Sequence, residues 1–508
     1  MKNLFLSEKA GDFNLLAYIE NEESIRLRIS HISAGKHFAE HFKVQILNKN
    51  LDVIGVEDIN KNNIQIIFKN IKKKGTTEGL FVVKENGEYL DNIFTEKKIN
   101  PESVLHKKTY SEKSFTSTGE KLDYHWPIFQ KFKDTGYGSI IRATMTLHQV
   151  CMSRCQFCST IGRNKKDSIS LDEAKEFVEK LYFEQAEFNK KNFRKYNSSY
   201  LKNTGSDIRL KGLILSGGGQ PNLWPHFEEF VNWLSDKDIS LGLITNGFPK
   251  KVSEKIYDNF DWIRISITPE DASSFYPNQK FNLQYVPENI LNNKKITLGL
   301  SYVYGPWSDD EIIKRIDETS YKWDCDYVRF LTDCNLSREY QLKSHIDLSN
   351  RLLKLKLIDD EGNPLRKIFH QLKYHGTKEE AEQIWTEGQC YLQIFNTFWD
   401  TTGHEENGYS YCFPCDSVTV LAEGDQEDSY DAKNIFSERK FNYSKWGTYK
   451  NTEVENLYKE KVKNFFDPRK NCSACLFQKN NKKAKELIKI NDYESIEIDN
   501  KIKHVNFP

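Results

Sequence analysis

Two hydrophobic patterns follow one another along the chain. Before about residue 125, short runs alternate apolar and polar residues, as in "KVQILN" (43–48), "IQIIFKNI" (64–71) and "GLFVVKENGEYL" (79–90). A period of two is typical of half-buried strands, and "ENGE" in the third run is a hairpin-turn sequence. We therefore expect a β-rich domain over 1–125, which ends in a polar, linker-like stretch (110–121).

From about residue 138, strand and helix patterns alternate. The helical pattern over 170–183 begins with a capping box of Ser170 and Glu173, and the pattern over 308–316 begins with Ser308 and Glu311. A third covers 225–234. Six apolar runs predict strands: 139–147, 212–215, 241–247, 262–268, 296–305 and 326–331. Apolar strands alternating with helices predict a parallel sheet covered by helices. We expect an α/β fold whose six strands form a partial (β/α)6 TIM-like barrel over 138–340.

The pattern is less regular after residue 340. Helical stretches at 343–356 and 377–387 precede a segment that holds five cysteines, and we assign 341–480 to a helical connection and a small cluster-binding domain. Residues 481–508 read as a polar tail. Residues 190–207 read as a polar insertion in the barrel.

The net charge and the number and clustering of cysteines limit the classes of function that the chain can have. The chain of 508 residues carries 73 basic and 73 acidic residues, so the basic excess of a nucleic-acid-binding protein is missing and that partner is disfavoured. No apolar run approaches the ~20 residues of a membrane span, and no secretory signal is evident. We expect a cytoplasmic protein, in which clustered cysteines are metal ligands or catalysts.

Three of the ten cysteines lie in one short loop, "CMSRCQFC" (151–158). Thiolates suit zinc or iron–sulfur clusters. A structural zinc site with a remote fourth ligand is one interpretation. The neighbouring His148 stands at a strand end and is a poor candidate for that ligand. Three thiols from one loop also suit a [4Fe–4S] cluster with one iron left open, and the loop follows a strand end, where βα barrels carry their chemistry.

The loop resembles the Cys-x3-Cys-x-aromatic-Cys signature of the radical S-adenosylmethionine (radical SAM) superfamily, and "SGGGQP" (216–221) resembles the glycine-rich motif after the family's second strand. The resemblance implies that Cys151, Cys155 and Cys158 hold a [4Fe–4S] cluster. It also implies reductive cleavage of S-adenosylmethionine to a 5′-deoxyadenosyl radical, which abstracts hydrogen from the substrate. The family commonly has Glu where this chain has Gln220.

Residues that contact S-adenosylmethionine also follow from the resemblance. "ITNG" (244–247), "RIS" (264–266), "LGLSYV" (298–303) and "YVRF" (327–330) resemble the ends of later barrel strands. Arg264 and Arg329 lie inside apolar strands and need partners. The implied cofactor-binding residues are Phe157, Ser216, Gly217, Gly218, Gly219, Gln220, Pro221, Arg264 and Ser266. No catalytic acid or base is singled out.

A second cysteine group follows residue 389. Cys472 and Cys475 form a metal knuckle, which Cys390 and one of Cys412 or Cys415 complete to four ligands, for either zinc or an auxiliary cluster. The arrangement resembles the SPASM or shortened twitch domains of the family, which implies one auxiliary [4Fe–4S] cluster. Cys412 follows an Asn-Gly turn and Cys415 forms a Cys-x-x-Cys with it, so the choice between them stays open. Cys325 and Cys334 read as buried structural thiols.

The expected function is that of a radical SAM enzyme acting on a small polar metabolite, sugar- or nucleoside-like, by oxidation or epimerisation. A ribosomal-peptide maturase is the alternative, since strand edges could hold a peptide. A zinc-stapled binding protein without catalytic activity is the second alternative. The expected partner is an external electron donor such as a flavodoxin or ferredoxin, with no membrane involved.

Overall fold

The structure is a computed structural model. It describes the strands within residues 3–99 and the following ranges: 114–117, 119–155, 157–158, 164–267, 273–275, 286–333, 338–360, 362–371, 389–408, 410–415, 449–450 and 477–508. The chain divides into two compact units. One comprises 1–107 with 343–366, and the other comprises 108–342 with 367–508.

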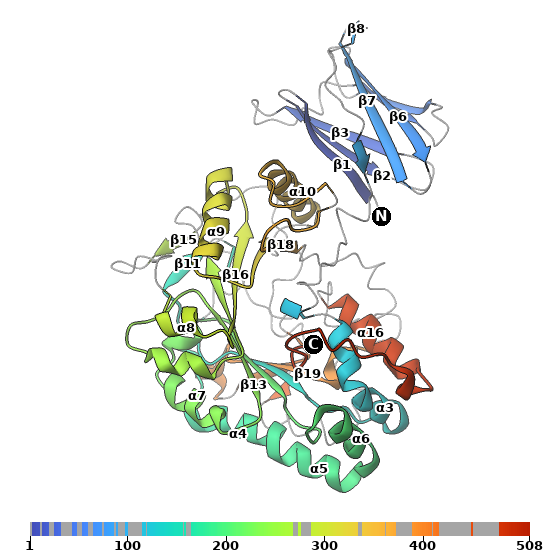
Figure 1. Ribbon diagram of the computed structural model, residues 1–508. Helices are drawn as coiled ribbons and strands as arrows, with labels where there is room; N and C mark the ends of the chain where they lie inside the picture. Colours follow the sequence, from blue (N-terminus) through green and yellow to red (C-terminus); the bar gives the residue numbers. More distant parts are fainter. Residues whose placement is uncertain are drawn as a thin grey trace. The chain divides into compact units, whose positions relative to one another are not determined.

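The first unit contains two antiparallel-rich sheets (Figure 1). One sheet consists of β1 (Asn3–Ala10), β2 (Phe13–Ile19) and β3 (Ile25–His31); the other contains β4 (Lys43–Leu47), β5 (Val53–Asp58), β6 (Ile64–Lys73), β7 (Thr76–Glu85), β8 (Glu88–Tyr89) and β9 (Lys97–Ile99). The three strands predicted from alternation are present as β4, β6 and β7. Glu85 pairs with Glu88, which confirms the predicted hairpin.

The second unit is built on a ten-stranded sheet. Six parallel strands lie side by side in chain order: β10 (Arg142–Met145), β12 (Gly212–Leu215), β13 (Ser240–Thr245), β14 (Trp262–Ile267), β16 (Thr297–Tyr304) and β17 (Tyr327–Thr332). All six match the predicted runs, so the α/β class is confirmed. Two further parallel strands extend the edges, β18 (Ile368–Gln371) beside β17 and β19 (Asn396–Asp400) beside β10. Antiparallel β20 (Tyr411–Phe413) and β21 (Tyr449–Lys450) follow β19.

The two faces of this sheet differ in chemistry. One face is apolar, with Leu213, Leu243 and Ile263 each buried, and Phe177 of α4 packs there against Trp399. The helices of the βα units surround the sheet (Figure 1): α4 (Leu171–Glu179), α5 (Gln185–Asn192), α6 (Arg194–Thr204), α7 (Phe227–Ser235), α8 (Glu288–Asn292) and α9 (Asp310–Lys322). The other face, here the second face, carries polar side chains: Arg142, Thr144, Arg264, Ser266, Thr297, Ser301 and Arg329.

Helix starts show where local sequence decides structure. Ser170 accepts from Glu173 N–H while Glu173 returns a bond to Ser170, so the predicted capping box of α4 is confirmed. The predicted start of α9 was wrong by one residue. Asp309 caps that helix through Ile312 N–H at 2.7 Å, and the Ser308 hydroxyl instead accepts from Gly305 N–H.

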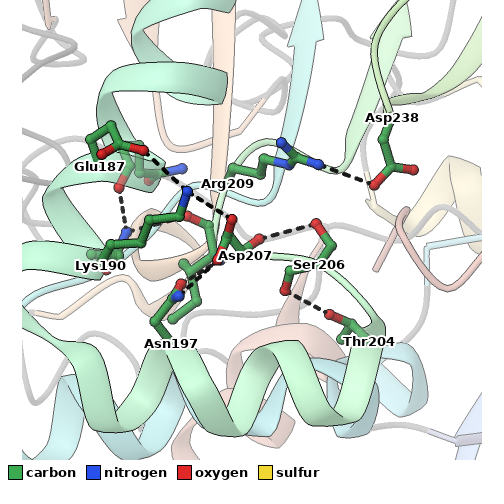
Figure 2. Close-up of polar contacts among 11 residues, drawn as sticks. Glu187, Lys190, Asn197, Thr204, Ser206, Asp207, Arg209 and Asp238 are labelled. Carbon is green, nitrogen blue, oxygen red and sulfur yellow. Dashed lines mark hydrogen bonds and ion pairs between the residues drawn. The ribbon is translucent and has the colours of Figure 1, made fainter.

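The predicted polar insertion at 190–207 is largely helical. A π-helical turn (Lys180–Glu184) joins α4 to α5, and α6 ends at Gly205 in the left-handed conformation. Figure 2 shows polar contacts among residues of this region and between Arg209 and Asp238, which precede β12 and β13. The Asp207 carboxylate forms an ion pair with Lys190 Nζ at 3.0 Å and accepts a hydrogen bond from Asn197 Nδ2 at 2.9 Å. The Asp238 carboxylate forms an ion pair with Lys211 Nζ at 2.6 Å.

The segment predicted as a polar tail packs against the rest of the second unit. Its first residues form most of α16 (Gln478–Lys489), which lies beside α3 (Trp126–Thr135). The His504 ring bonds Thr297 at 2.8 Å, and Phe507 packs on Trp262. Residues 504–508 therefore cover the amino ends of several strands on the second face. The remaining elements are α10 (Arg338–Lys354), α12 (His404–Asn407), β11 (Ser153–Cys155), β15 (Ser273–Phe275) and 3-10 turns at Gly119–His125, Pro221–Leu223, Glu254–Asn259, Tyr391–Ile394 and Tyr493–Ser495.

Candidate functional site

The cysteine loop begins at the carboxyl end of β10. Cys151, Cys155 and Cys158 are each half-buried, and the Cys158 amide donates to the Cys155 carbonyl at 3.1 Å, which closes a turn between them. Strand β11 within the loop pairs with β15, which follows β14. The loop is therefore held at the end of the sheet where βα folds place their chemistry.

The sulfur of Cys151 receives two hydrogen bonds. Asn246 Nδ2 donates to it at 3.4 Å and the Ser153 amide at 3.5 Å. Burial raises the pKa of the Cys151 thiol and Cys158 adds to this, while the bonds from Ser153 and Asn246 act against it. Asn246 also donates to Ser153 Oγ at 3.3 Å. The end of β13 thus holds the first cysteine through Asn246.

The donor set fits an iron–sulfur cluster by its chemistry. Three thiols on one loop offer soft ligands, and hydrogen bonds directed at a ligating sulfur are a usual part of such sites. Across the described ranges, no three His, Cys, Asp or Glu side chains lie close enough together to hold a metal ion. His148 is turned away from this role: its Nε2 donates to the Gln220 carbonyl at 2.7 Å, and burial lowers the pKa of its ring.

The glycine loop after β12 packs directly on the chain that leads to Cys151. A Cβ added at Gly217 would lie 1.9 Å from Thr146 Oγ1, and one at Gly219 would lie 2.4 Å from the Val150 carbonyl oxygen. Gly217 also has φ +118, a conformation that side chains disfavour. The glycines are thus needed for contact between the two loops.

Backbone hydrogen bonds also join the glycine loop to the segment between β10 and Cys151. The Ser216 amide donates to Met145 O at 3.1 Å, the Gly219 amide to His148 O at 3.0 Å, and the Gln220 amide to Val150 O at 2.8 Å. The predicted cysteine and glycine motifs are therefore brought together as one structure.

Gln220 and Pro221 lie at the end of this glycine loop. Gln220 is buried, and its Nε2 donates to Gly247 O at 2.9 Å. Its Oε1 is buried and has no hydrogen-bond partner among the described residues. Pro221 begins the short 3-10 turn that follows. The Gln220 amide nitrogen therefore holds the segment after β13 by a hydrogen bond, while the amide oxygen remains available as an acceptor.

Arg264 and Ser266 lie on the second face. Arg264 pairs with Gly299, over which the Tyr327 ring lies. Ser266 pairs with Ser301, and Ser301 with Arg329, so these residues form a polar row across three strands.

Phe157, the aromatic residue of the loop, contacts Trp307, with ring centroids 5.5 Å apart. Trp307 Nε1 donates to Val303 O at 3.1 Å, which fixes the indole at the end of β16. Burial raises the pKa of the Cys325 thiol to about 12, in agreement with an inert structural thiol. Cys334 lies outside the described residues.

Sequence reasoning missed the polar residues that join β10 to β19. Gln149 Nε2 donates to Asp400 Oδ1 at 3.3 Å and to Thr401 Oγ1 at 2.9 Å. Asp167 is buried and accepts from the Gly403 amide at 2.7 Å and from the Glu405 amide at 2.9 Å. These contacts connect residues that are more than 200 positions apart in the sequence. No local sequence pattern could have predicted them.

Three cysteines of the second group are buried around β19. Cys390 immediately precedes the 3-10 turn before β19, and Cys412 pairs with Trp399. Because β20 runs antiparallel, Cys415 returns to the end of β19 that Cys390 precedes. Cys412 lies three residues, roughly 10 Å, further along. Asn407 is the last residue of α12, and Gly408 caps that helix with φ +70, so the predicted Asn407-Gly408 turn is the end of a short helix. Cys472, Cys475 and the predicted helix at 377–387 lie outside the described residues.

Comparison with known proteins gives weak similarity only. No family model matches the chain, and no curated protein matches it. Similar solved structures include Streptococcus suis SuiB bound to the precursor peptide SuiA (12% identity, TM-score 0.38, covering 68% of this chain and 78% of that one). Another is TYW1 with a lysine-pyruvate adduct bound (14%, 0.27, 46% and 80%). A third is BtrN in complex with AdoMet and 2-DOIA (12%, 0.24, 64% and 92%). At these TM-scores the similarity carries no conclusion about this chain. Within the described ranges, no helix is both long and apolar enough to span a membrane.

Proposed function

We propose that the chain is a radical SAM enzyme whose cysteine loop holds a [4Fe–4S] cluster through Cys151, Cys155 and Cys158. The observation that carries the proposal is the joining of two motifs from neighbouring parallel strands. The glycine loop after β12 donates three backbone hydrogen bonds to Met145 O, His148 O and Val150 O, in the segment that leads from β10 into the cysteine loop. Six parallel strands in chain order support a partial barrel beneath them.

The cluster and S-adenosylmethionine together would supply a 5′-deoxyadenosyl radical for hydrogen abstraction. The chain's own residues bind and orient these groups. Asn246 donates to Cys151, and residues 216–221 offer backbone and side-chain groups to the methionyl end of S-adenosylmethionine. Phe157 with Trp307 forms an aromatic wall beside the loop. Arg264 and Ser266, on the second face, would hydrogen-bond the remaining polar groups of the cofactor.

The second cysteine group is proposed to hold one auxiliary [4Fe–4S] cluster. Cys390 and Cys415 are the ligands that the β19–β20 register favours, with Cys472 and Cys475 completing the set. Cys412, fully buried opposite Trp399, is then the spare thiol. Replacing Cys415 by Ser is expected to remove the auxiliary cluster, whereas Cys412→Ser retains it.

A small polar metabolite is the proposed substrate. The row of Ser266, Ser301 and Arg329 supports this, because these side chains would face a ligand held over the second face. We propose oxidation or epimerisation as the reaction, a flavodoxin or ferredoxin as electron donor, and the cytoplasm as location. A substrate would be recognised by its increase of 5′-deoxyadenosine formation under reducing conditions.

The first experiment is an iron count with EPR spectroscopy on anaerobically reconstituted protein. The wild type is compared with the variant in which Cys151, Cys155 and Cys158 are all replaced by Ala. Two clusters predict roughly eight irons per chain, falling to about four in the variant. A change in the EPR signal on addition of S-adenosylmethionine, seen only in the wild type, would assign the open iron.

Other outcomes would contradict parts of the proposal. Bound zinc with little iron would overturn the radical mechanism and favour a zinc-stapled binding protein. A count of about four irons in the wild type, lost completely in the variant, would overturn the auxiliary cluster alone.

A further inference from the structure

Three neighbouring strands place an excess of positive charge on the second face of the sheet. Among the described residues of β14, β16 and β17, two arginines lie on this face, Arg264 and Arg329, and no aspartate or glutamate does. Charged side chains inside a sheet are costly unless a group of opposite charge lies nearby. This part of the second face is therefore suited to an anion.

The carboxylates nearest in sequence to these strands have other positions. Asp261 and Asp326 stand just before β14 and β17, and they accept hydrogen bonds from the amides of Leu241 at 2.7 Å and Leu298 at 2.9 Å. Asp333 follows the last residue of β17, roughly 13 Å along an extended chain from the arginine of that strand. None of the three stands in the rows of the two arginines.

The two guanidinium groups act on the same hydroxyl group. Arg264 and Arg329 stand in adjacent rows, roughly 10 Å apart across the strands and 7 Å along them, which two long side chains can span. A Cβ added at Gly299 would lie 2.4 Å from the Tyr327 hydroxyl, so the phenol crosses β16 towards β14. Burial raises the pKa of Tyr327, and the charges of Arg264 and Arg329 act against this. Both charges are thus felt at one place on the second face.

Serine hydroxyls supply neutral donors beside these charges. Ser301 pairs with Arg329 on one side and with Ser266 on the other. Arg329 is 5% exposed and Ser301 is 7% exposed. Arg264 Nε is buried and has no hydrogen-bond partner among the described residues. Carboxylate and phosphate oxygens accept hydrogen bonds from both guanidinium and hydroxyl groups.

Apolar side chains close the site towards the amino ends of the strands. The Trp262 ring centroid lies 5.9 Å from the guanidinium carbon of Arg264. Ile214 and Phe507 pack with Trp262 in one buried cluster. This cluster blocks the approach from the amino ends, so a ligand approaches from the carboxyl ends, where the cysteine loop begins. Apolar surroundings also strengthen the attraction between an anion and the guanidinium groups.

We infer that Arg329 and Ser301 bind an anionic group of the substrate, a carboxylate or a phosphate, and that Arg264 adds charge from the adjacent row. The substrate is then an anionic metabolite rather than a neutral sugar or nucleoside. This inference rests on the proposed function and deepens it, because it names the chemistry by which the substrate is held. Arg264 keeps the contacts to the cofactor proposed above.

The test measures binding of inorganic phosphate and of acetate by equilibrium dialysis, on reconstituted protein saturated with S-adenosylmethionine. The anion that binds the wild type more tightly indicates which group the substrate carries. Arg329→Met removes the charge and should weaken that binding about tenfold to a hundredfold, the usual effect of losing hydrogen bonds between charged groups. Arg329→Lys keeps the charge without the bidentate geometry and should recover part of the loss. Equal binding by the wild type and Arg329→Met would overturn the inference.

Arg209→Met is the matched control. Arg209 lies outside the site and pairs with Asp238 at 3.4 Å. This variant should bind phosphate and acetate as the wild type does. A loss as large as that of Arg329→Met would show that the effect is not specific to the second face and would overturn the inference.

The carboxylate of S-adenosylmethionine must be distinguished from that of a substrate. Arg329→Met should bind S-adenosylmethionine within about twofold of the wild type, as expected for independent sites. Phosphate or acetate should not displace it. Equal losses for cofactor and anion, or competition between them, would assign the anion site to the cofactor and overturn the inference.

Ser301→Ala serves if Arg329→Met does not fold. It removes one donor and should weaken anion binding about threefold; unchanged binding would count against the inference. A neutral compound that raises 5′-deoxyadenosine formation equally in the wild type and Arg329→Met would also overturn it. If the reconstituted wild type does not bind S-adenosylmethionine, the proposed function has failed. A wild type that binds S-adenosylmethionine but neither anion refutes this inference alone.

Discussion

Gly219→Ala is the sharpest single test of how the two loops fit together. The new Cβ would lie 2.4 Å from Val150 O and 2.6 Å from His148 O. Carbon–oxygen contacts lie at roughly 3.3–3.6 Å, so the loops must separate by about 1 Å. Both neighbours are backbone atoms, which cannot rotate away as a side chain could.

The energetic cost follows from this movement. Overpacking costs about 1–3 kcal/mol. The bonds from Gly219 N to His148 O and from Gln220 N to Val150 O are both strained, at about 0.5–1.5 kcal/mol each. A displacement of about 1 Å at a binding loop is expected to lower the rate of S-adenosylmethionine cleavage about 100-fold.

The assay combines thermal denaturation, S-adenosylmethionine binding and 5′-deoxyadenosine formation. Gly205→Ala is the matched control, because a Cβ there meets nothing within 4 Å and only the φ of +74 is unfavourable. It should lose about 1–2 kcal/mol of stability and keep its binding. If Gly219→Ala binds and reacts as the wild type does, the close packing of the loops is not what requires the glycine.

Three other substitutions test separate contacts. Asn246→Leu removes the bond to Cys151 and should lower the midpoint potential of the cluster by roughly 20–40 mV, at 59 mV per tenfold change; an unchanged potential in redox titration would contradict this. Asp167→Ala leaves the Gly403 and Glu405 amides without their acceptor and should destabilise the unit by about 1–3 kcal/mol, whereas Asp167→Asn should recover part of the loss in melting experiments. Burial lowers the pKa of Lys131 well below its ordinary value, so the unfolded chain binds that proton more tightly than the folded chain does. The melting temperature of the wild type relative to Lys131→Met should therefore rise from pH 7 to pH 9, and a difference that shrinks over this range would refute the argument.

The six central strands could be predicted because each is a short apolar run between helical patterns. The helix α6 was missed, because only Asn197 and Tyr200 of its residues are buried, and so few buried positions produce no clear helical periodicity. Gly205 after its last turn was the available signal. The cap of α9 was misplaced because Ser308 and Asp309 are both good caps, and Gly305 competes for the serine hydroxyl.

The sequence predicted the two motifs of the site but not the residues that hold them in place by hydrogen bonds. Cysteine spacing and a glycine run are local patterns, so Cys151 and Gly218 could be identified. The roles of Gln149 and Asp167 depend on residues near 400, which only the folded chain brings to β10. Likewise, the antiparallel pairing of Cys412 with Trp399 separates it from Cys415, which spacing alone did not.

The position of β10 has a consequence for biosynthesis. One of its neighbours, β12, follows within about 70 residues, but the other, β19, begins only at Asn396. Ribosomes add residues at about 5–20 per second, so one edge of β10 waits more than ten seconds for its partner. A nascent chain that stops before β19 presents that edge unpaired, next to three thiols. Such truncated products should aggregate readily, and loading of the cysteine loop should follow completion of the chain.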